Sequence, residues 1–440
     1  MKKLILLEIC FLFLATGFQG DRLSPGWVIQ QIPVNKEIVD IYFIDNLNGW
    51  AVTDYGQSYD TGYILKTTNG GNNWNINFAA HFSFMAIQFV NYNTGYACGG
   101  YGDGRVYKTT NNGNNWTIIL DAGQLFTDLW FVNKDTGWVA DDGDPFGIGL
   151  IKTTNGGINW FQQLNYSFRP EKLFFLNKDT GWMVNSSSVL YRTINSGNNW
   201  FLNYDFGTSQ IQGIFFTSND TGWVSRWGSN DQLLKTINSG YNWQVQMDPD
   251  SNNSVHCGIF MINSKLGYIS TAYSKILKTT DGINWGKQNA PQGGYGSIFF
   301  TDSLHGWSSR VRQVNSVWTY DIVATTDGGG PVTKTAENNI EIIPSFKLEQ
   351  NYPNPFNPTT KIKFEIPNIL SFQRKLESSN VKLKIFDVSG KEIFTLVNEE
   401  LQTGTYTATF DGRFLPSGIY IAGLYVNNNF FNSIKMLMIK

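Results

Sequence analysis

The sequence predicts an all-β protein: a seven-bladed β-propeller closed by its N-terminal strand, followed by a small Ig-like antiparallel β-sandwich. Three observations support this. A turn motif that ends in tryptophan recurs, an apolar segment followed by glycine and an aromatic residue alternates with it, and the composition changes from Gly328 onward. Because a repeat of about 40 to 46 residues fits one four-stranded blade, seven copies predict a complete ring.

The N-terminus has the features of a secretory signal peptide over residues 1–20. Two lysines precede an apolar stretch and then small residues, so cleavage is expected after Gly17 or Gly20. No other segment approaches the roughly 20 apolar residues that a membrane helix needs. We therefore expect an exported protein without a transmembrane helix, whose propeller spans residues 21–332.

The composition excludes some classes of function. The net charge is -2 and charged residues make up 15% of the chain, so no basic surface for nucleic acid is expected. Cys98 and Cys257 remain after cleavage, in the second and sixth repeats. These repeats are not neighbours in a ring, so we expect two free thiols, with a disulfide as the alternative.

Each repeat divides into four strands. Apolar segments such as Ile41–Ile44 and Ile214–Thr217 predict innermost strands that are buried on both faces. A turn and a glycine follow, and the aromatic residue after it, such as Trp50, opens the second strand. The third strand ends in a basic residue that we expect to face solvent, at Lys66, Lys108, Lys152, Arg192, Lys235 and Lys278.

The turn motif leads to the fourth strand and accounts for ring closure. Six copies, such as "TTNGGNNW" from Thr67, end in the tryptophan that begins this strand: Trp74, Trp116, Trp160, Trp200, Trp243 and Trp285. The seventh copy, "TTDGGGP", has Val332 where tryptophan is expected, whereas Trp27 in "GWVIQQI" follows no turn motif. We therefore predict that the strand beginning at Trp27 completes the last blade and removes an exposed sheet edge.

This turn motif resembles the Asp-box, or BNR repeat. Its acidic position is mostly asparagine here: Asn69, Asn111, Asn155, Asn195 and Asn238, with Asp281 and Asp327 in the last two copies. A short side-chain carbonyl in an Asx turn and a glycine with positive φ suit a structural role. Together with "ILKTTNGGNNW", residues 24–332 resemble the photosystem II assembly and stability factor-like propellers. That resemblance implies the fold, and it leaves an assembly factor for a membrane complex as one functional hypothesis.

The C-terminal part begins after an expected linker at residues 333–345. Prolines Pro353, Pro355 and Pro358 predict an irregular arm, after which short alternating runs predict a sandwich of about seven strands. Residues 346–440, with "LEQNYPNPFNPTTKIKFEIP" and "GTYTATFDGRFLPSGIYIAGL", resemble the type A sorting domain of type IX secretion. The resemblance implies the secretion machinery as a partner and a location outside the cell or on its surface.

Two kinds of hydrolase were considered as alternatives. Sialidase chemistry needs an arginine cluster and a tyrosine nucleophile with a glutamate partner, but Glu37 and Glu171 are the only glutamates of the ring and neither is suitably placed. Endoglucanase-like chemistry would use a pair of loop carboxylates, with candidates at Asp54, Asp103, Asp142 and Asp144. A secreted glycoside hydrolase is thus the alternative, while no catalytic residue, cofactor or metal is assigned.

The main hypothesis is non-catalytic binding of a protein or polysaccharide by a monomer. Loops between second and third strands, and between successive blades, should share one face, with the Asp-boxes on the other. Exposed aromatic and arginine residues favour recognition. The residues expected on the first face are Tyr55, Tyr59, Tyr101, Asp103, Arg105, Asp142, Phe146, Arg226, Trp227, Arg310, Arg312 and Trp318.

Overall fold

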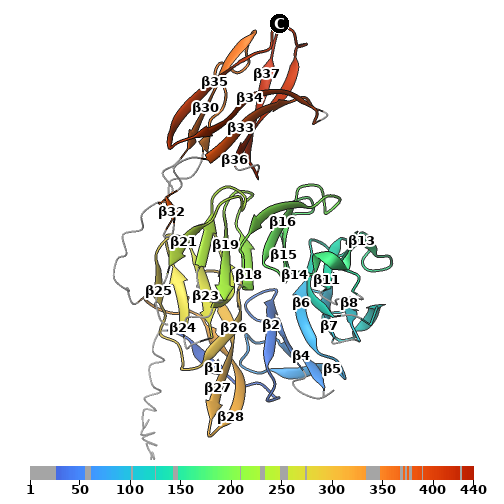
Figure 1. Cartoon of the computed structure of the whole chain (residues 1–440). Coiled ribbons are helices and arrows are strands. Elements are labelled where there is room, and N and C mark those ends of the chain that lie inside the picture. The colour runs from blue at the N-terminus through green and yellow to red at the C-terminus, as the bar shows by residue number, and fades with distance from the viewer. Residues whose placement is uncertain are drawn as a thin grey trace, which may run out of the picture. The chain divides into compact units, whose positions relative to one another are not determined.

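The computed structural model describes most of the chain. The described residues are 26–54, 61–100, 103–123, 125–141, 147–208, 210–227, 233–247, 256–272, 275–332, 347–366, 370–371, 374–375, 379–388, 390–426 and 429–440. The expected signal peptide and linker lie outside them. The chain folds as two compact units, a propeller and a C-terminal sandwich, which are described separately (Figure 1).

The propeller consists of seven four-stranded sheets, numbered here as blades one to seven in chain order. The inner strands are β2 (Ile38–Phe43), β6 (Phe84–Phe89), β10 (Phe126–Phe131), β14 (Pro170–Phe175), β18 (Gln210–Phe216), β22 (His256–Met261) and β26 (Gly294–Phe300). The second strands are β3 (Gly49–Thr53), β7 (Gly95–Gly99), β11 (Gly137–Asp141), β15 (Gly181–Asn185), β19 (Gly222–Trp227), β23 (Gly267–Thr271) and β27 (Gly306–Val314).

The remaining strands complete each blade on its outer side. The third strands are β4 (Gly62–Thr67), β8 (Arg105–Thr109), β12 (Leu150–Thr153), β16 (Val189–Thr193), β20 (Leu233–Thr236), β24 (Lys275–Thr279) and β28 (Val317–Thr325). The outer strands are β5 (Asn75–Ala80), β9 (Thr117–Asp121), β13 (Phe161–Leu164), β17 (Phe201–Asp205), β21 (Gln244–Met247), β25 (Trp285–Lys287) and β1 (Val28–Gln30). A short 3-10 helix, Tyr166–Phe168, precedes β14.

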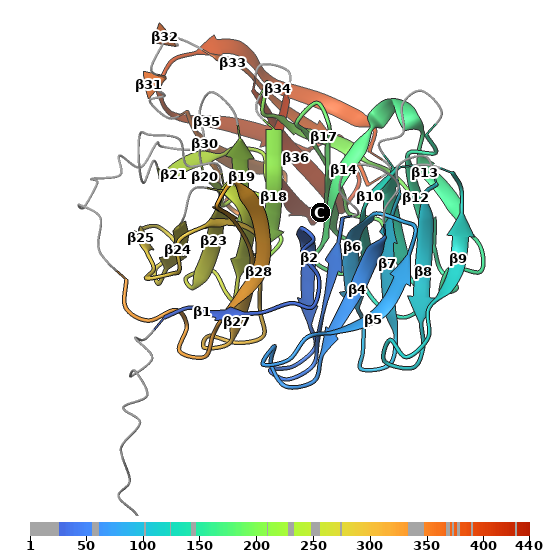
Figure 2. The same ribbon diagram turned by 90° about the horizontal axis from the view of Figure 1, so that it is seen from below.

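The N-terminal strand closes the ring, as predicted. Strand β1 pairs antiparallel with β28, and Val28, Ile29 and Gln30 lie opposite Ala324, Val323 and Ile322 (Figure 2). Trp27 meets the ring of Phe300 edge-on at 5.7 Å, as Trp74 meets Phe43 at 5.8 Å. Trp27 therefore occupies the place of the tryptophan that the seventh turn motif lacks.

Adjacent blades pack through aromatic pairs. The aromatic residue that opens a second strand stacks on a phenylalanine of the next blade's inner strand, with ring centroids 3.5–3.8 Å apart. The six pairs are Trp307–Phe43, Trp50–Phe89, Tyr96–Phe131, Trp138–Phe175, Trp182–Phe216 and Tyr268–Phe300. In the seventh seam Trp223 shares a buried cluster with Met261.

The glycine before each of these aromatic residues makes room for a large side chain of its own blade, which is Met261 in blade six and a phenylalanine in the others. A Cβ on Gly137 would lie 2.3 Å from the ring of Phe131, and one on Gly181 would lie 2.4 Å from that of Phe175. Such distances are far inside van der Waals contact, so the ring can lie against the backbone only where no side chain is present.

The basic residues of the third strands do not face solvent, contrary to expectation. Lys152 lies 5.1 Å above the ring of Trp138, and its Nζ donates a 2.8 Å hydrogen bond to the carbonyl of Ser196 in the next blade. The side chain is directed into the seam because the aromatic ring and the carbonyl attract the cation there. Equivalent lysines donate to the next blade's turn carbonyls, namely Lys66 to Asn112, Lys108 to Gly156, Lys235 to Gly282 and Lys278 to Gly328.

The closing seam, between blades seven and one, uses a different donor. Ala324 lies where the other blades have lysine or, in blade four, arginine, opposite Trp307. Gln30 of β1 donates instead, through Nε2, to the carbonyl of Gly70 at 2.8 Å, and Trp307 Nε1 donates to the same carbonyl at 3.0 Å. The N-terminal strand thus supplies both the last strand of blade seven and part of its contact with blade one.

Hydrogen bonds within each Asp-box hold its turn. A threonine hydroxyl donates to the Asn or Asp side chain at 2.8–3.1 Å and accepts a glycine N–H at 2.7–2.9 Å. The side chains that accept are Asn69, Asn111, Asn155, Asn195, Asn238, Asp281 and Asp327. This threonine, two residues before the Asx, satisfies buried backbone groups that would otherwise lack partners.

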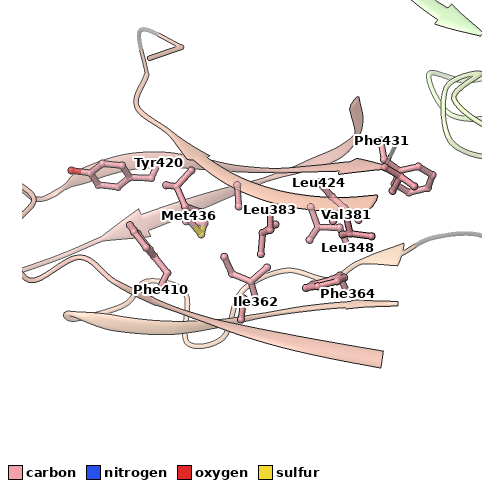
Figure 3. Close-up of a cluster of buried hydrophobic side chains, with 14 of the residues drawn as sticks. Leu348, Ile362, Phe364, Val381, Leu383, Phe410, Tyr420, Leu424, Phe431 and Met436 are labelled. Carbon is pink, nitrogen blue, oxygen red and sulfur yellow. The ribbon is translucent and has the colours of Figure 1, made fainter. Parts of the chain in front are cut away.

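The C-terminal unit is a two-layer sandwich. Its strands are β29 (Lys347–Leu348), β30 (Thr359–Ile366), β31 (Leu370–Ser371), β32 (Arg374–Lys375), β33 (Ser379–Phe386), β34 (Glu392–Leu401), β35 (Gly404–Asp411), β36 (Gly418–Val426) and β37 (Asn429–Met438). One layer has the order β29-β30-β35 and the other β34-β33-β36-β37. Apolar side chains from both layers meet between them, including Ile362 and Phe410 opposite Leu383 and Met436 (Figure 3).

Candidate functional site

The structure describes seven of the twelve residues expected on the binding face. Tyr55, Tyr59, Tyr101, Asp142 and Phe146 lie outside the described residues. The seven fall into three groups: Asp103 and Arg105 on blade two, Arg226 and Trp227 on blade five, and Arg310, Arg312 and Trp318 on blade seven. All three groups lie in or beside the connection between a second and a third strand, so they share one end of the propeller.

Arg310 is a structural residue, which corrects its assignment to an exposed binding surface. It is only 4% exposed, and its Nε and Nη2 each donate a 2.6 Å hydrogen bond to the carboxylate of Asp321. Its Nη1 donates to the carbonyl of Gln292 at 2.7 Å. These contacts use all sides of the guanidinium, because a buried charge is stable only when it is paired and hydrogen-bonded.

The other arginines differ in their ion pairs and in their exposure to solvent. Arg105 pairs with Asp121 at 2.9 Å and lies 4.0 Å from Asp103, so blade two presents one arginine beside two carboxylates. Arg312 lies 3.8 Å from Asp321 with much of its side chain exposed. Arg226 of β19 lies opposite Ile211 of β18 in the sheet. The residue after it, Trp227, is 48% exposed.

Blade seven carries an extended hairpin. Strands β27 and β28 have nine residues each, and their pairing continues to Val314 opposite Val317. The tight turn uses Asn315 and Ser316, both with positive φ, which fits the right-handed twist of a hairpin. Trp318 is 55% exposed beside this turn, and its carbonyl accepts a 3.0 Å hydrogen bond from Asn35. The hairpin therefore presents an aromatic side chain on a hydrogen-bonded support.

A cavity lies in the central channel of the propeller, at the same end as the connections between second and third strands. It was not predicted from the sequence. Its volume is about 410 Å³, and the first residues of the inner strands line it. Each inner strand has a register shift at this point. The lining residues that lie within or directly after these shifts include Asp40, Ala86, Asp128, Lys172, Gly213, Gly258 and Ser297.

Asp40 and Asp128 connect neighbouring blades inside the channel wall. Asp40 accepts N–H groups from Ile41 and, in the next blade, from Ile87, both at 2.9 Å. Asp128 accepts at 2.8 Å from Leu129 and from Leu173 of the next blade. Burial raises the pKa of both carboxyls to about 6, because desolvation disfavours their charged forms.

Glu37 also lines the cavity, and Asp54 lies beside Glu37. The backbone N–H of Asp54 donates to the carbonyl of Glu37 at 3.2 Å, and Ser83 donates to the Asp54 carboxylate. Burial, with a smaller contribution from the charge of Asp54, raises the pKa of Glu37. Burial also raises the pKa of Tyr320 on the hairpin, with contributions from Glu37 and Asp54, so the hairpin lies within electrostatic reach of the rim.

Other candidate chemistries find little support in the described part of the chain. No three His, Cys, Asp or Glu side chains are grouped there as a metal site would require. Cys98 and Cys257 are not joined by a disulfide; Cys98 is buried and Cys257 lines the cavity. Among the described residues no helix is long and apolar enough to cross a bilayer.

The fold defines an all-β class of protein: a seven-bladed propeller joined to a small sandwich. Residues 350–440 match the family described as the secretion system C-terminal sorting domain. This domain directs export by the type IX system, so the protein reaches the cell surface or the extracellular space. No curated protein matches the chain.

Solved structures with a similar fold include propellers of several kinds. YCF48 bound to D1 peptide is 17% identical, with a TM-score of 0.55 over 69% of this chain and 97% of that one. YCF48 from Cyanidioschyzon merolae is 14% identical, with a TM-score of 0.54 over 68% and 98%. The extracellular domain of a hybrid two component system from B. thetaiotaomicron is 11% identical, with a TM-score of 0.51 over 94% and 57%. At these identities the similarity establishes the fold.

Proposed function

We propose that the propeller is a non-catalytic binding module that recognises a protein or polysaccharide outside the cell. The observation that carries this proposal is the arrangement at one end of the channel. There, a cavity of about 410 Å³ adjoins a hairpin that holds Trp318 exposed, and blade five adds Trp227 on the same end. Exposed aromatic side chains on a rigid support are typical of recognition hot spots.

The sorting domain and the similar structures support this proposal from other directions. A protein delivered to the cell surface meets macromolecules there, and a loop-bearing propeller face offers them a broad surface. A structurally similar propeller, YCF48, is bound to D1 peptide, which supports a protein segment as the ligand here. We also propose that residues 21–332 act as a monomeric unit and that residues 346–440 contact the secretion machinery.

Capture of a partner from native cell envelope would test the proposal. The mature chain would be immobilised beside Trp318→Ala, Trp227→Ala and the double variant, with Ile158→Ala as the matched control. Ile158 is an exposed apolar residue in an Asp-box turn, at the opposite end of the propeller. We expect the double variant to lose at least about tenfold in captured partner, since each hot-spot aromatic contributes at least ~1 kcal/mol.

Two outcomes would count against the proposal. Equal capture by the double variant and the mature chain would show that this end of the propeller is not the binding face. Cleavage of a polysaccharide in a screening panel, lost in Asp103→Asn or Asp142→Asn, would replace binding by glycoside hydrolysis.

A further inference from the structure

The residues that line the central cavity carry more negative than positive charge. Glu37, Asp40 and Asp128 contribute carboxyls from blades one and three, whereas Lys172 of blade four is the one basic residue among the described residues that line the cavity. At neutral pH the lining therefore carries an excess of negative charge. A group that enters the cavity meets this excess between the walls of the channel, where electrostatic attraction is stronger than at a flat surface.

Hydrogen bonds hold the carboxylates of Asp40 and Asp128 in fixed positions. Asp40 and Asp128 are held by backbone N–H groups of their own strand and of the next blade, so neither side chain can turn away from the channel wall. Ser297 also donates to Asp40, at 3.1 Å. The carboxylates are thus pre-organised before any ligand binds, which reduces the entropic cost of binding.

The entrance to the cavity suits a side chain that has an apolar stem. Met85, Val39 and Ile298 line the cavity together with the carboxyls. At the rim, Asn35 links to the hairpin, since its Oδ1 accepts a 3.1 Å hydrogen bond from the N–H of Tyr320 and its Nδ2 donates to the carbonyl of Trp318. Aromatic and apolar groups can therefore contact the stem of a ligand whose charged end reaches the carboxylates.

We propose that this cavity binds an ammonium or guanidinium group, presented by a lysine or arginine side chain of the protein partner. The inference rests on the proposed binding function and names the part of the partner that enters the channel. The partner's backbone would cross the face beside Trp318, and its basic side chain would extend along Met85 toward Glu37, Asp40 and Asp128.

The protonation of the cavity supports a cationic ligand at neutral pH. The pKa values of Asp40 and Asp128 are raised to about 6 by burial, so both are charged at pH 7.5 but largely protonated at pH 5. The other titratable groups that line the cavity are Glu37, Lys172 and Cys257, with Asp54, Glu171 and Tyr320 nearby. Burial raises the pKa of Cys257 to about 11, so this thiol stays neutral in the same range. A lysine ligand keeps its charge at both pH values.

The test uses a small probe and a reporter inside the cavity. The full mature chain, labelled with 13C at its methionine methyl groups, would be titrated with Nα-acetyl-lysine amide and, as the uncharged match, Nα-acetyl-norleucine amide. The Met85 signal would be assigned with Met85→Leu. We expect the Met85 signal to shift in a saturable way with the lysine probe at pH 7.5, and the response to the norleucine probe to be at least about tenfold weaker.

Variants and pH distinguish this binding from an effect on folding. Glu37→Gln should weaken binding of the lysine probe at least about threefold. Asp135 is an exposed carboxylate in a turn of blade three, so Asp135→Asn should leave this binding unchanged. In the wild-type chain the response should be lost at pH 5. Equal responses to both probes, no Met85 response, or an unchanged response at pH 5 would each overturn the proposal. If the double variant of Trp318 and Trp227 still lost partner capture in those cases, the proposed function would stand without this inference.

Discussion

Lysine side chains on the third strands of five blades donate hydrogen bonds to the next blade. The clearest example is Lys152, which is 8% exposed, lies over Trp138 and donates to the carbonyl of Ser196. Burial lowers the pKa of this ammonium, and the charge of Asp179 acts in the opposite direction. The contact is a charge-assisted hydrogen bond combined with a cation–π interaction.

Replacing this lysine should weaken the seam between blades three and four. We expect Lys152→Met to lower the free energy of unfolding by about 1–3 kcal/mol, because the hydrogen bond and the cation–π contact are both lost. Urea unfolding of the mature chain would measure this. The matched control is Lys134→Met, whose exposed ammonium contacts only Asp135 beside it and should contribute less than about 0.5 kcal/mol. A similar loss in both variants would contradict the assigned role of Lys152.

Asp128 should make stability depend on pH in an unusual direction. Its pKa is about 6 in the folded chain and 3.8 as an ordinary value, so between these values the folded state binds the extra proton. The free energy of unfolding should therefore fall as pH rises from 4 to 6.5 on account of this group. In Asp128→Asn this contribution is absent, so the variant should lose less stability than the wild type over that interval. Parallel pH profiles of urea unfolding for the two proteins would rule out the assignment.

The N-terminal strand is short, but it makes several contacts that close the ring. With three residues, β1 completes blade seven, places Trp27 against Phe300 and positions Gln30 to contact Gly70 of blade one. Trp27 and Trp74 make equivalent edge-on contacts, at 5.7 and 5.8 Å. The two tryptophans should therefore contribute similarly to the stability of the ring.

Alanine substitutions would compare these tryptophans directly. We expect Trp27→Ala and Trp74→Ala each to lower the free energy of unfolding by about 3–5 kcal/mol, as for other buried aromatic side chains. Trp318→Ala, at an exposed position of the hairpin, should change it by less than about 0.5 kcal/mol. A small effect of Trp27→Ala next to a large effect of Trp74→Ala would mean that β1 is only loosely attached.

The elements that repeat could be predicted from the sequence, whereas contacts between repeats could not. The period identified seven blades, and the turn motif without a tryptophan identified the partner strand of Trp27. The predicted orientation of the Lys152 side chain toward solvent was wrong, because its orientation depends on a carbonyl 44 residues away in the next blade. The cavity was missed because the apolar segments predicted as inner strands begin at Ile41 and Leu129, directly after Asp40 and Asp128, whereas β2 and β10 begin three residues earlier.

The ion pair between Arg310 and Asp321 could have been predicted from the sequence. Register counted outward from the turn at Asn315 and Ser316 places Arg310 opposite Asp321. Opposite charges facing each other across a hairpin often pair. Reading the long strands of blade seven as one hairpin would therefore have indicated an internal ion pair in place of a free binding residue.

At the scale of the whole molecule, the sorting domain determines where the propeller acts. Removing residues 346–440 should leave the protein inside the envelope of a host with type IX secretion, because the matched domain lies within that segment. Fractionation with an antibody to the propeller would show this. As the control, the same segment fused to an unrelated periplasmic reporter should carry the reporter out of the cell. Undiminished export of the shortened chain would contradict the assignment.

Closure of the ring by the first strand is the claim on which the binding face depends, since it sets both the number of blades and the hairpin beside the channel. The most direct measurement is the urea unfolding curve of the mature chain against the same chain without residues 21–32. Closure predicts a clearly lower midpoint for the shortened chain, because blade seven loses its outer strand, Trp27 and the Gln30 contact to blade one. Superimposable curves would contradict it.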